Sequence, residues 1–438
     1  MSSDIVLWMF PVLMALIFLG FPIAFSMMIT ALGFGLARFG DKVFYQFAQR
    51  VDDVATNYVL GAIPLFVFMG AILERAGIAE KLFDALYMWT RRLPGGLAVA
   101  ALLMCTIFAA ASGVVGATET LVGMLAIPAM MKRNYHPRLI SGTICGGGSL
   151  GTVIPPSIPV VVLAPIAALP IGDLMAGILV PGLMMSALFT LYIVMAAWLK
   201  PEYAPRDETV DPRTLGEKLV VTLTALVPPA ILIATVLGSL FMGLATPTEA
   251  AACGSFGVLV LAILYRRLTL RVLYQATLQT ISLTAMILAI VLAGGMFSGV
   301  FFASGGMGEV QGILRSFGLD AWSVIAIILF VTFILGFVLD LISVVLILVP
   351  ISMPLLRVYG VDPLWFSIVF LVTLQTSYLT PPMSPSIFYL KAIAPPSIKL
   401  SDMYWGVIPF ICCQIVILAL VLTFPELATW MPKVIYGY

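Results

Sequence analysis

Charged residues are scarce in this chain, which has 438 residues and is 62% hydrophobic and only 10% charged. Soluble domains have roughly 25% charged residues, so the composition excludes a soluble globular protein. It indicates a polytopic α-helical membrane protein, because the short alternating segments of a transmembrane β-barrel are not found. The net charge of +1 argues neither for nor against a charged partner, and no basic, aromatic-rich patch indicates nucleic-acid binding.

The sequence also lacks the motifs of several enzyme classes. It has no P-loop, so we predict no ATP hydrolysis, and it has neither a Ser/His/Asp arrangement nor a metal-ligand spacing. The single histidine, His136, lies at a predicted helix boundary, which argues against a proton relay through it. The five cysteines lie in apolar stretches and are predicted to be buried small hydrophobic residues: Cys105, Cys145, Cys253, Cys412 and Cys413.

What the chain has instead is an apolar sequence interrupted by glycine and proline. Residues 141–162 read SGTICGGGSLGTVIPPSIPVVV, in which Pro155 and Pro156 remove two N–H donors and stop a helix. At membrane depth such backbone is tolerated only where it is buried in protein or lines a watery cavity. The segment is either a proline-kinked helix or a helix unwound at mid-membrane, whose free carbonyls and helix ends hold an ion or a small anion.

A second copy of this pattern favours the unwound helix. Residues 376–390 read TSYLTPPMSPSIFYL, and their paired prolines follow the first pair by 226 residues. Paired interrupted hydrophobic segments in matching positions are typical of the binding sites of secondary transporters. The same offset separates Pro128 from Pro354 and Pro137 from Pro363, and an offset of 225 separates Pro22 from Pro247.

We therefore predict an all-α polytopic membrane protein of two repeats, residues 1–208 and 209–438. Each repeat holds scaffold helices, an interfacial helix, a re-entrant helical hairpin and a broken transmembrane helix. A straight helix as long as either hairpin segment would overshoot the hydrocarbon core, which about 20 residues span. In the first repeat these elements are predicted at 4–37, 78–93, 95–133 and 137–165. In the second they are predicted at 217–265, 305–318, 320–358 and 362–391. Further helices are predicted at 59–75, 171–199, 281–303 and 401–432, and amphipathic interfacial segments at 37–53 and 265–275.

The number of crossings predicts that the second repeat is inverted. Each repeat crosses the membrane five times when a hairpin counts as zero, and an odd number reverses the orientation. With this arrangement 16 of the 22 lysines and arginines lie on one side and 6 on the other. The positive-inside rule makes the richer side cytoplasmic. Both termini are then outside, and the first hairpin opens to the cytoplasm and the second to the exterior.

Three acidic residues need separate accounts. Glu249 in ATPTEAA is predicted to complete a capping box with Thr246, a structural role. Asp340 lies in the apolar run FILGFVLDLISVVLILVP, where its charge must be compensated. A bound cation or the backbone N–H groups of the hairpin tip would do this, so a functional site and a helix cap are both open. Glu119 lies a turn past the first hairpin interruption, and a function, a water-facing position or a capping role all stay open.

Hydroxyl side chains gather at the interruptions of both repeats. A cation such as sodium needs hard oxygen ligands, which hydroxyls and the carbonyls of unwound backbone supply. The alternative is that these hydroxyls only satisfy the backbone of kinked helices. The residues are Ser112, Ser149 and Thr152 in the first repeat and Thr376, Ser377 and Thr380 in the second.

At these residues the chain resembles the large membrane subunit of tripartite ATP-independent periplasmic (TRAP) transporters. The resemblance covers nearly the whole chain and implies an elevator-type transporter, in which a transport domain of hairpins and broken helices moves against a scaffold. It rests on AIPLFVFMG (62–70), the SGVVGA hairpin, LGTVIPPSIP (150–159), GLATPTEAA (243–251), the Asp340 hairpin, LTPPMSPSIFYL (379–390) and GVIPF (406–410).

The resemblance also implies a function and its partners. Such proteins lie in the bacterial inner membrane and import small organic acids with sodium as the coupling ion and no other cofactor. A soluble periplasmic binding protein delivers the substrate, and a separate small four-helix membrane subunit is expected, since no such segment precedes the first repeat. The implied substrates are carboxylates such as keto acids or dicarboxylates. A stand-alone symporter or antiporter of related fold is the alternative within transport. A channel or a lipid-modifying enzyme is the alternative outside it, although an enzyme should show acid–base pairs that this sequence lacks.

The resemblance also implies where ions and substrate bind, since the family's sodium sites lie at the hairpin tips and at the breaks of the broken helices. The hairpin tip SGVVGA departs from the family's usual Ser-Gly-Ser form. The implied sodium ligands are Ser112, Gly113, Gly151, Thr152, Gly336, Asp340, Thr376 and Thr380. The residues expected at the substrate are Ser157, Asp340, Thr380, Ser384 and Ser386.

Overall fold

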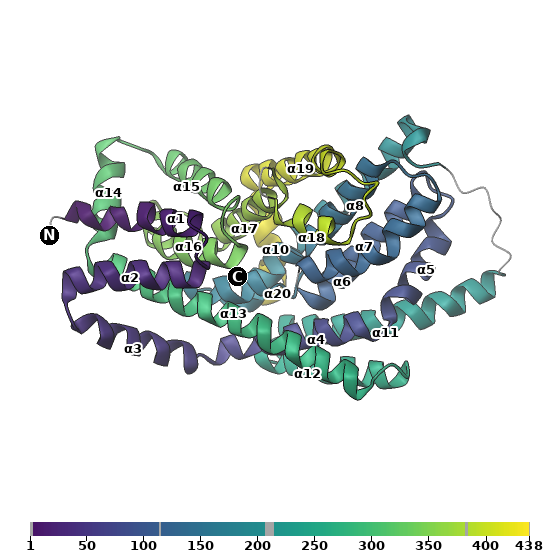
Figure 1. Cartoon of the computed structure of the whole chain (residues 1–438), viewed down its shortest axis with the longest axis horizontal. Helices are drawn as coiled ribbons and strands as arrows, with labels where there is room; N and C mark the ends of the chain where they lie inside the picture. The colour runs from purple at the N-terminus through teal and green to yellow at the C-terminus, as the bar shows by residue number, and fades with distance from the viewer. Residues whose placement is uncertain (1–2, 114, 206–213, 382–383, 438) are drawn as a thin grey trace.

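The computed structural model describes residues 3–113, 115–205, 214–381 and 384–437. Every regular element within these residues is a helix, and seven of the helices are long and apolar enough to cross a membrane. These findings confirm the predicted all-α polytopic fold (Figure 1). The helices before the central linker are α1 (Met9–Phe18), α2 (Ile23–Phe39), α3 (Lys42–Ala55), α4 (Ala62–Arg75), α5 (Ile78–Thr90), α6 (Gly96–Ser112), α7 (Val115–Lys132), α8 (Pro137–Ser149), α9 (Ile158–Ala167) and α10 (Ile171–Leu199). Those after it are α11 (Leu215–Phe241), α12 (Pro247–Leu264), α13 (Leu270–Ala303), α14 (Gly306–Ser316), α15 (Ala321–Leu335), α16 (Leu341–Val358), α17 (Pro363–Leu379), α18 (Pro385–Ile393), α19 (Leu400–Thr423) and α20 (Glu426–Tyr436).

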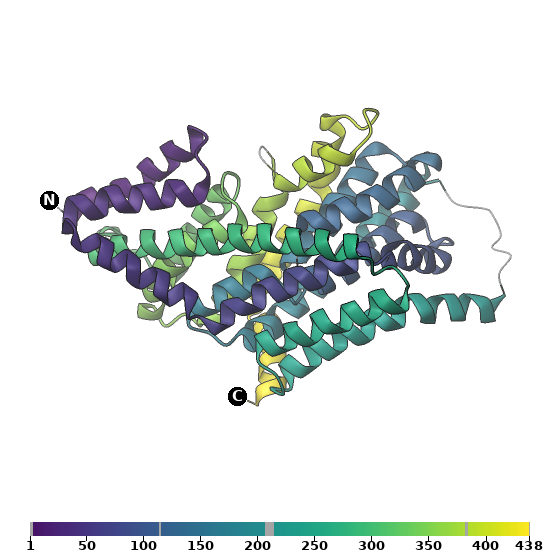
Figure 2. The same cartoon turned by 60° about the horizontal axis from the view of Figure 1, so that its bottom comes forward.

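One set of helices forms an elongated layer along the molecule. Helix α13 runs beside α2, α3 and α4, and α4 packs on α12, which in turn packs on α11. Figures 1 and 2 show these helices following the long axis, with α11 and α12 on one side. Many large apolar side chains of α11 and α12 are exposed, as expected for helices that face lipid. We call the helices α2, α3, α4, α11, α12 and α13 the scaffold layer.

The two predicted hairpins and broken helices form the rest of the centre. Helices α6 and α7 pack against each other, as do α15 and α16, and each pair lies at its own end of the central bundle (Figure 1). Helices α8, α10, α17 and α19 pack between the pairs. The chain is interrupted between α8 and α9 and again between α17 and α18, where both broken helices were predicted.

Equivalent positions of the two repeats meet at the centre of the bundle. Pro137 and Pro363, 226 residues apart, each occupy the first turn of a helix, α8 and α17 respectively. Ser149 and Gln375 are separated by the same offset, and the Gln375 side-chain amide donates to the Ser149 hydroxyl over 3.3 Å. A contact between equivalent positions is the geometry expected near an axis that relates two repeats. The repeat boundaries and the inverted orientation in the membrane stay predictions.

The sequence prediction was wrong about the start of the scaffold's longest helix. We expected an interfacial segment at 265–275 and a separate helix at 281–303, but α13 is one helix of 34 residues. Its N-cap is Thr269, whose hydroxyl accepts from the Val272 N–H. The basic, amphipathic character of 265–275 suggested a separate interfacial segment, but the helix continues through the following polar residues, where Thr277 and Thr280 donate to carbonyls one turn earlier.

The last predicted helix, 401–432, is two helices. Helix α19 ends at Thr423, and α20 begins at Glu426 after a break at Phe424 and Pro425. Proline disfavours helical backbone in the residue before it, and Phe424 has φ −123° and ψ 82°, outside the helical region. The apolar character of the segment continues across the break, which is why composition alone missed it.

A further expectation, the burial of all five cysteines, was wrong for three of them. Cys253 and Cys412 are exposed and Cys413 is half-buried, whereas only Cys105 and Cys145 are buried as predicted. In α5, Ile78, Leu82 and Leu86 are buried, and Trp89 is half exposed and donates to the Thr222 hydroxyl. In a membrane protein an apolar residue is stable facing lipid as well as facing the core, so hydrophobicity does not report burial.

Candidate functional site

The first hairpin tip lies directly against the first helix break. Gly113 ends α6 in the left-handed region, with φ +60°, a conformation that glycine adopts without a steric penalty. A Cβ on Gly113 would lie 2.4 Å from the Pro156 carbonyl oxygen, so the backbone of the hairpin tip contacts the backbone of the break between α8 and α9. The structure therefore brings together two segments that the sequence marked separately. The side chain of Ser112, a predicted sodium ligand, lies outside the described part of the structure.

Hydroxyls hold the first break together. The Thr152 hydroxyl donates to the Ser149 carbonyl oxygen over 2.9 Å, and the Ser157 hydroxyl donates to the Thr152 carbonyl oxygen over 2.7 Å. Gly151 and Thr152 form a short 3₁₀ turn with Leu150, and all are buried. Each hydroxyl retains lone pairs after donating, so these bonds stabilise the break and leave oxygen atoms that can still accept or coordinate.

The second tip repeats this contact. A Cβ on Gly336, the residue after α15, would lie 2.1 Å from the Ser377 hydroxyl oxygen. That hydroxyl donates to the Phe333 carbonyl oxygen over 2.9 Å. The second hairpin is thus bonded to the end of α17.

Asp340 occupies the N-cap of α16. One carboxylate oxygen accepts from the backbone N–H groups of Ile342 and Ser343, at 3.1 and 3.4 Å, and the other accepts from the Ser343 hydroxyl. The capping role left open by the sequence is therefore present. A cap does not exclude an ion, because a carboxylate oxygen accepts from more than one partner.

The second break exposes backbone acceptors beside two threonines. Thr376 and Thr380 each donate to a carbonyl one turn earlier, at 2.8 and 2.6 Å. The last carbonyls of a helix have no intrahelical donors, and Pro381 has no N–H to supply one. Beyond the break, the Ser384 hydroxyl donates to the Leu379 carbonyl oxygen over 3.1 Å. Pro382 lies outside the described residues.

A polar cluster at the bundle centre was missed by sequence reasoning. The side-chain amides of Gln375 and Gln414 both donate to the Ser149 hydroxyl over 3.3 Å, and Ser149 donates to the Gly146 carbonyl oxygen. The side-chain carbonyl oxygens of both glutamines are buried without a hydrogen-bond partner. The available signal was two glutamines within apolar helices, where a polar side chain is costly.

Glu119 and Ser386 join the two repeats. Glu119 is fully buried in α7, and its Oε1 atom accepts a hydrogen bond of 2.5 Å from the Ser386 hydroxyl of α18. Ser386, predicted to bind substrate, therefore faces an acid of the first hairpin. Of the roles left open for Glu119, a water-facing position is wrong.

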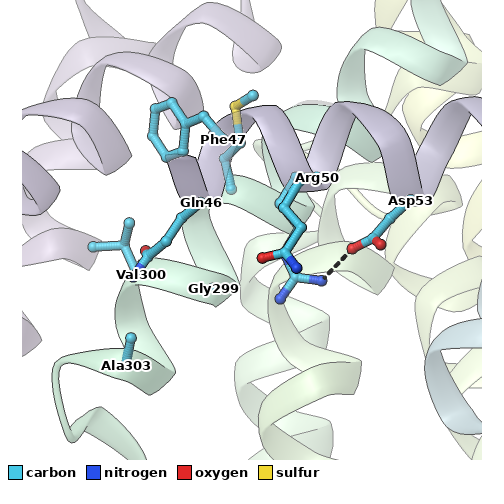
Figure 3. A pocket seen from close by; sticks show the side chains of 9 residues that line it. Gln46, Phe47, Arg50, Asp53, Gly299, Val300 and Ala303 are labelled. Atoms are coloured by element: carbon cyan, nitrogen blue, oxygen red, sulfur yellow. Dashed lines mark hydrogen bonds and ion pairs between the residues drawn. The ribbon is translucent and has the colours of Figure 1, made fainter. Parts of the chain in front are cut away.

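A cavity lined by residues of α3 and α13 lies in the scaffold layer. It has a volume of about 350 Å³, and Arg50 lies in it with Asp53, 3.1 Å from the guanidinium (Figure 3). An adjoining cavity of about 330 Å³ is lined by Arg50 and α13 on one side and by Pro165 of α9 and Pro350 of α16 on the other. We call the hairpins and broken helices, α6–α9 and α15–α18, the broken-helix core. The packing between the scaffold layer and this core is therefore incomplete at the cavity.

The remaining titratable residues singled out by the sequence have structural roles. The Thr246–Glu249 capping box is confirmed, with reciprocal bonds of 3.3 and 2.8 Å at the start of α12. His136 caps α8 by accepting from the Arg138 N–H, and burial together with the nearby Arg138 charge lowers its pKa, which favours the neutral ring that capping needs.

The chain is similar in sequence to a known protein family and to individual known proteins. The family described as "Tripartite ATP-independent periplasmic transporter, DctM component" matches residues 10–427. The C4-dicarboxylate TRAP transporter large permease protein DctM of Pseudomonas aeruginosa is 28% identical over 387 residues, covering 88% of this chain and 89% of that protein. The 2,3-diketo-L-gulonate TRAP transporter large permease protein YiaN of Escherichia coli is 28% identical over 412 residues, covering 93% and 94%.

A solved structure shares the fold. The Alcanivorax borkumensis YdaH transporter superposes with a TM-score of 0.66 at 14% sequence identity, covering 100% of this chain and 98% of that one. At this identity the likeness concerns the arrangement of helices alone.

Proposed function

The chain belongs to the DctM component family of tripartite ATP-independent periplasmic transporters, and from this membership we propose that it is the large transmembrane subunit of a sodium-coupled importer of small organic acids. It is a multi-pass membrane transporter subunit and not an enzyme, since its relatives are transporter permeases. The observation that carries the finer proposal is the pairing of each hairpin tip with the helix break of its own repeat, at Gly113–Pro156 and at Gly336–Ser377.

The donor set at the two breaks fits sodium. At the second break it consists of the Asp340 carboxylate, the Thr376 and Thr380 hydroxyls and the carbonyls at the end of α17. At the first it consists of Thr152 and the unwound backbone around Gly151. These are hard oxygen ligands at discontinuous helices, where coupling ions bind in secondary transporters. Sodium would supply positive charge there.

A carboxylate substrate fits the same site. The sequence has no lysine or arginine between 94 and 131 or between 316 and 356, which include both tips, so a bound cation and helix N-termini would attract the anion. The relatives named for C4-dicarboxylate and 2,3-diketo-L-gulonate also support an organic acid. Ser157, Ser384 and Ser386 stay proposed substrate contacts.

An elevator movement is proposed for the broken-helix core against the scaffold layer. The cavity lined by Arg50 on one side and by Pro165 and Pro350 on the other supports it, because a loosely packed boundary costs less to slide than a close-packed one. The exposed apolar face of the scaffold supports contacts with lipid and with a small four-helix subunit. A soluble periplasmic binding protein is proposed as the third component, delivering substrate to a complex in the bacterial inner membrane.

The proposed function is tested by uptake into proteoliposomes. The complex of this chain with its small subunit, supplied with the binding protein and scanned over carboxylates, should accumulate one of them when sodium is higher outside. ATP should have no effect, and replacing sodium by potassium or choline should stop uptake. An unchanged rate without sodium would show that the ion assignment is wrong, and uptake without the binding protein would favour a stand-alone symporter.

The proposed topology makes a separate prediction. A cysteine in place of Arg92, after α5, should react with an impermeant thiol reagent only from the cytoplasm, and one in place of Arg315, in α14, only from the periplasm. Both tests use a background in which the exposed Cys253 and Cys412 are replaced by serine. Labelling of the Arg92 position from outside intact spheroplasts would rule out the inverted-repeat orientation and the periplasmic placement of both termini.

A further inference from the structure

Glu119 is a fully buried acid whose charge has no obvious compensation. It has no exposed surface, and among the described residues Ser386 donates a hydrogen bond to its Oε1 atom, while its Oε2 atom is buried without a partner. Its side chain lies against α8, since a Cβ on Gly148 would come within 1.9 Å of the Glu119 Cγ atom. An ionised carboxylate in such a place is costly unless it is paired.

The groups that face Glu119 do not include a cation. Those that interact with it electrostatically are Cys105 of α6, Cys145 of α8, Tyr378 of α17 and Tyr389 of α18. No lysine, arginine or histidine among the described residues acts on it. Each of the four neighbours is neutral in its protonated form, so none of them can balance a negative charge.

The hydrogen-bond geometry suits the neutral acid. If Glu119 is ionised, the single O–H group of Ser386 donates its hydrogen bond to Oε1 and can donate to no other acceptor. If Glu119 is protonated, Oε1–H can donate to the Ser386 oxygen, and Ser386 can donate to the Cys145 carbonyl oxygen, 3.4 Å away. The protonated form therefore satisfies one more acceptor and buries no charge.

From this geometry we propose that Glu119 is a proton-binding site of the transport machinery. Its carboxylate takes a proton from water on the periplasmic side. The neutral acid then stays enclosed by α7, α8 and α18 while the transport machinery changes sides, and it releases the proton to water on the cytoplasmic side. A proton then enters together with the sodium-driven substrate. The inference rests on the proposed transport cycle and adds a second coupling ion to it.

One of the four neighbours of Glu119 reaches the surface of the molecule. Tyr389 of α18 is half exposed and packs on α7, where a Cβ on Gly116 would lie 2.8 Å from its ring. Gly116 lies one turn before Glu119, and Ser386 lies one turn before Tyr389. A shift of α18 along α7 would therefore break the Ser386 bond and uncover the acid in one movement.

The test follows proton movement in proteoliposomes that hold the whole complex, a pH-sensitive dye and a fixed inward sodium gradient. Substrate should acidify the lumen with the wild-type chain. With Glu119→Gln, which keeps the shape and the neutral state, uptake should remain sodium-dependent but the acidification should be lost completely. The rate should also lose its dependence on pH. The matched control is Glu74→Gln, a glutamate in α4 that lies 3.7 Å from Arg75 and should keep the proton signal.

The outcomes separate this inference from the proposed function. Sodium-driven uptake without acidification by the wild-type chain overturns the inference and leaves the proposed function intact, whereas no sodium-driven uptake at all overturns the function. Sodium dependence lost in Glu119→Gln would make the residue a sodium ligand and overturn the inference as well. Should Glu119→Gln fail to assemble, Glu119→Asp replaces it, and this variant should keep the acidification with a shifted pH dependence. An unshifted pH dependence in Glu119→Asp would count against the proton site.

Discussion

Asp340→Asn should reduce sodium-driven uptake by about tenfold or more, which corresponds to roughly 1.4 kcal/mol of lost stabilisation. Asparagine keeps the shape of the side chain and is as good an N-cap as aspartate. The start of α16 should therefore survive, with the side-chain carbonyl accepting from the Ile342 N–H, which lies 3.1 Å from the Asp340 carboxylate. What is lost is the charge that would hold a cation at the second break. Uptake measured over a range of sodium concentrations should show weaker dependence on sodium, with normal insertion and assembly.

The chain offers a matched control for this substitution. Asp320 caps α15 at the other end of the same hairpin, also accepting from the backbone and hydroxyl of a serine three residues on. It is part of an exposed cap, and the Ser323 hydroxyl lowers its pKa. Asp320→Asn should leave uptake unchanged, and Thr380→Val should weaken the apparent sodium affinity more mildly than Asp340→Asn. Normal transport and sodium response in Asp340→Asn would show that Asp340 is only a helix cap.

Gly142→Ala should destabilise the chain by roughly 1–3 kcal/mol, the usual cost of overpacking. The added Cβ would lie 2.2 Å from the Gly406 carbonyl oxygen and 2.6 Å from the Phe410 ring. Helices α8 and α19 therefore touch through their backbones, as small residues allow in membranes. Because the obstacle is backbone, the helices must separate. A lower melting temperature of the purified complex, followed by tryptophan fluorescence, and loss of uptake are expected.

The matched control is a glycine without neighbours. Gly238 lies within α11, and a Cβ there would meet nothing within 4 Å. Alanine is the better helix former by roughly 1 kcal/mol, so Gly238→Ala should leave stability unchanged or raise it. Equal melting temperatures for Gly142→Ala and the wild-type protein would show that α8 and α19 are not held at the distance that the structure gives.

Much of the fold could be predicted because its breaks are local. Pro155, Pro156 and Pro381 remove N–H donors wherever they occur, so the breaks that follow α8 and α17 could be predicted from the chain itself. The failures have the same origin. The break at Pro425 was missed because its flanks are apolar. Helix α13 was divided because residues 265–275 are basic and amphipathic, a pattern that an interfacial segment shares with the polar end of a longer helix.

The candidate site was predictable only as two tips and two breaks. Thr376, Thr380 and Asp340 could be selected because polar residues in apolar runs stand out. Their bonding could not, since whether a hydroxyl donates to its own helix or coordinates an ion is decided by backbone geometry. Gln375 and Gln414 were not selected from the sequence. Both donate to Ser149, which lies more than 200 residues away, so nothing near either glutamine indicates this bond.

The sequence by itself determined the membrane class, the twofold repetition and the positions of the interruptions, because composition, proline and glycine act on the backbone where they stand. Tertiary structure alone decided which interruptions face each other and which polar groups share a site. Glu119 and Ser386 are 267 residues apart and lie in different repeats, yet they form one buried pair. Nothing local to either residue specifies that contact. It exists because α18 packs on α7, and in a low-dielectric interior a buried carboxyl is stable only with the partners that such packing provides.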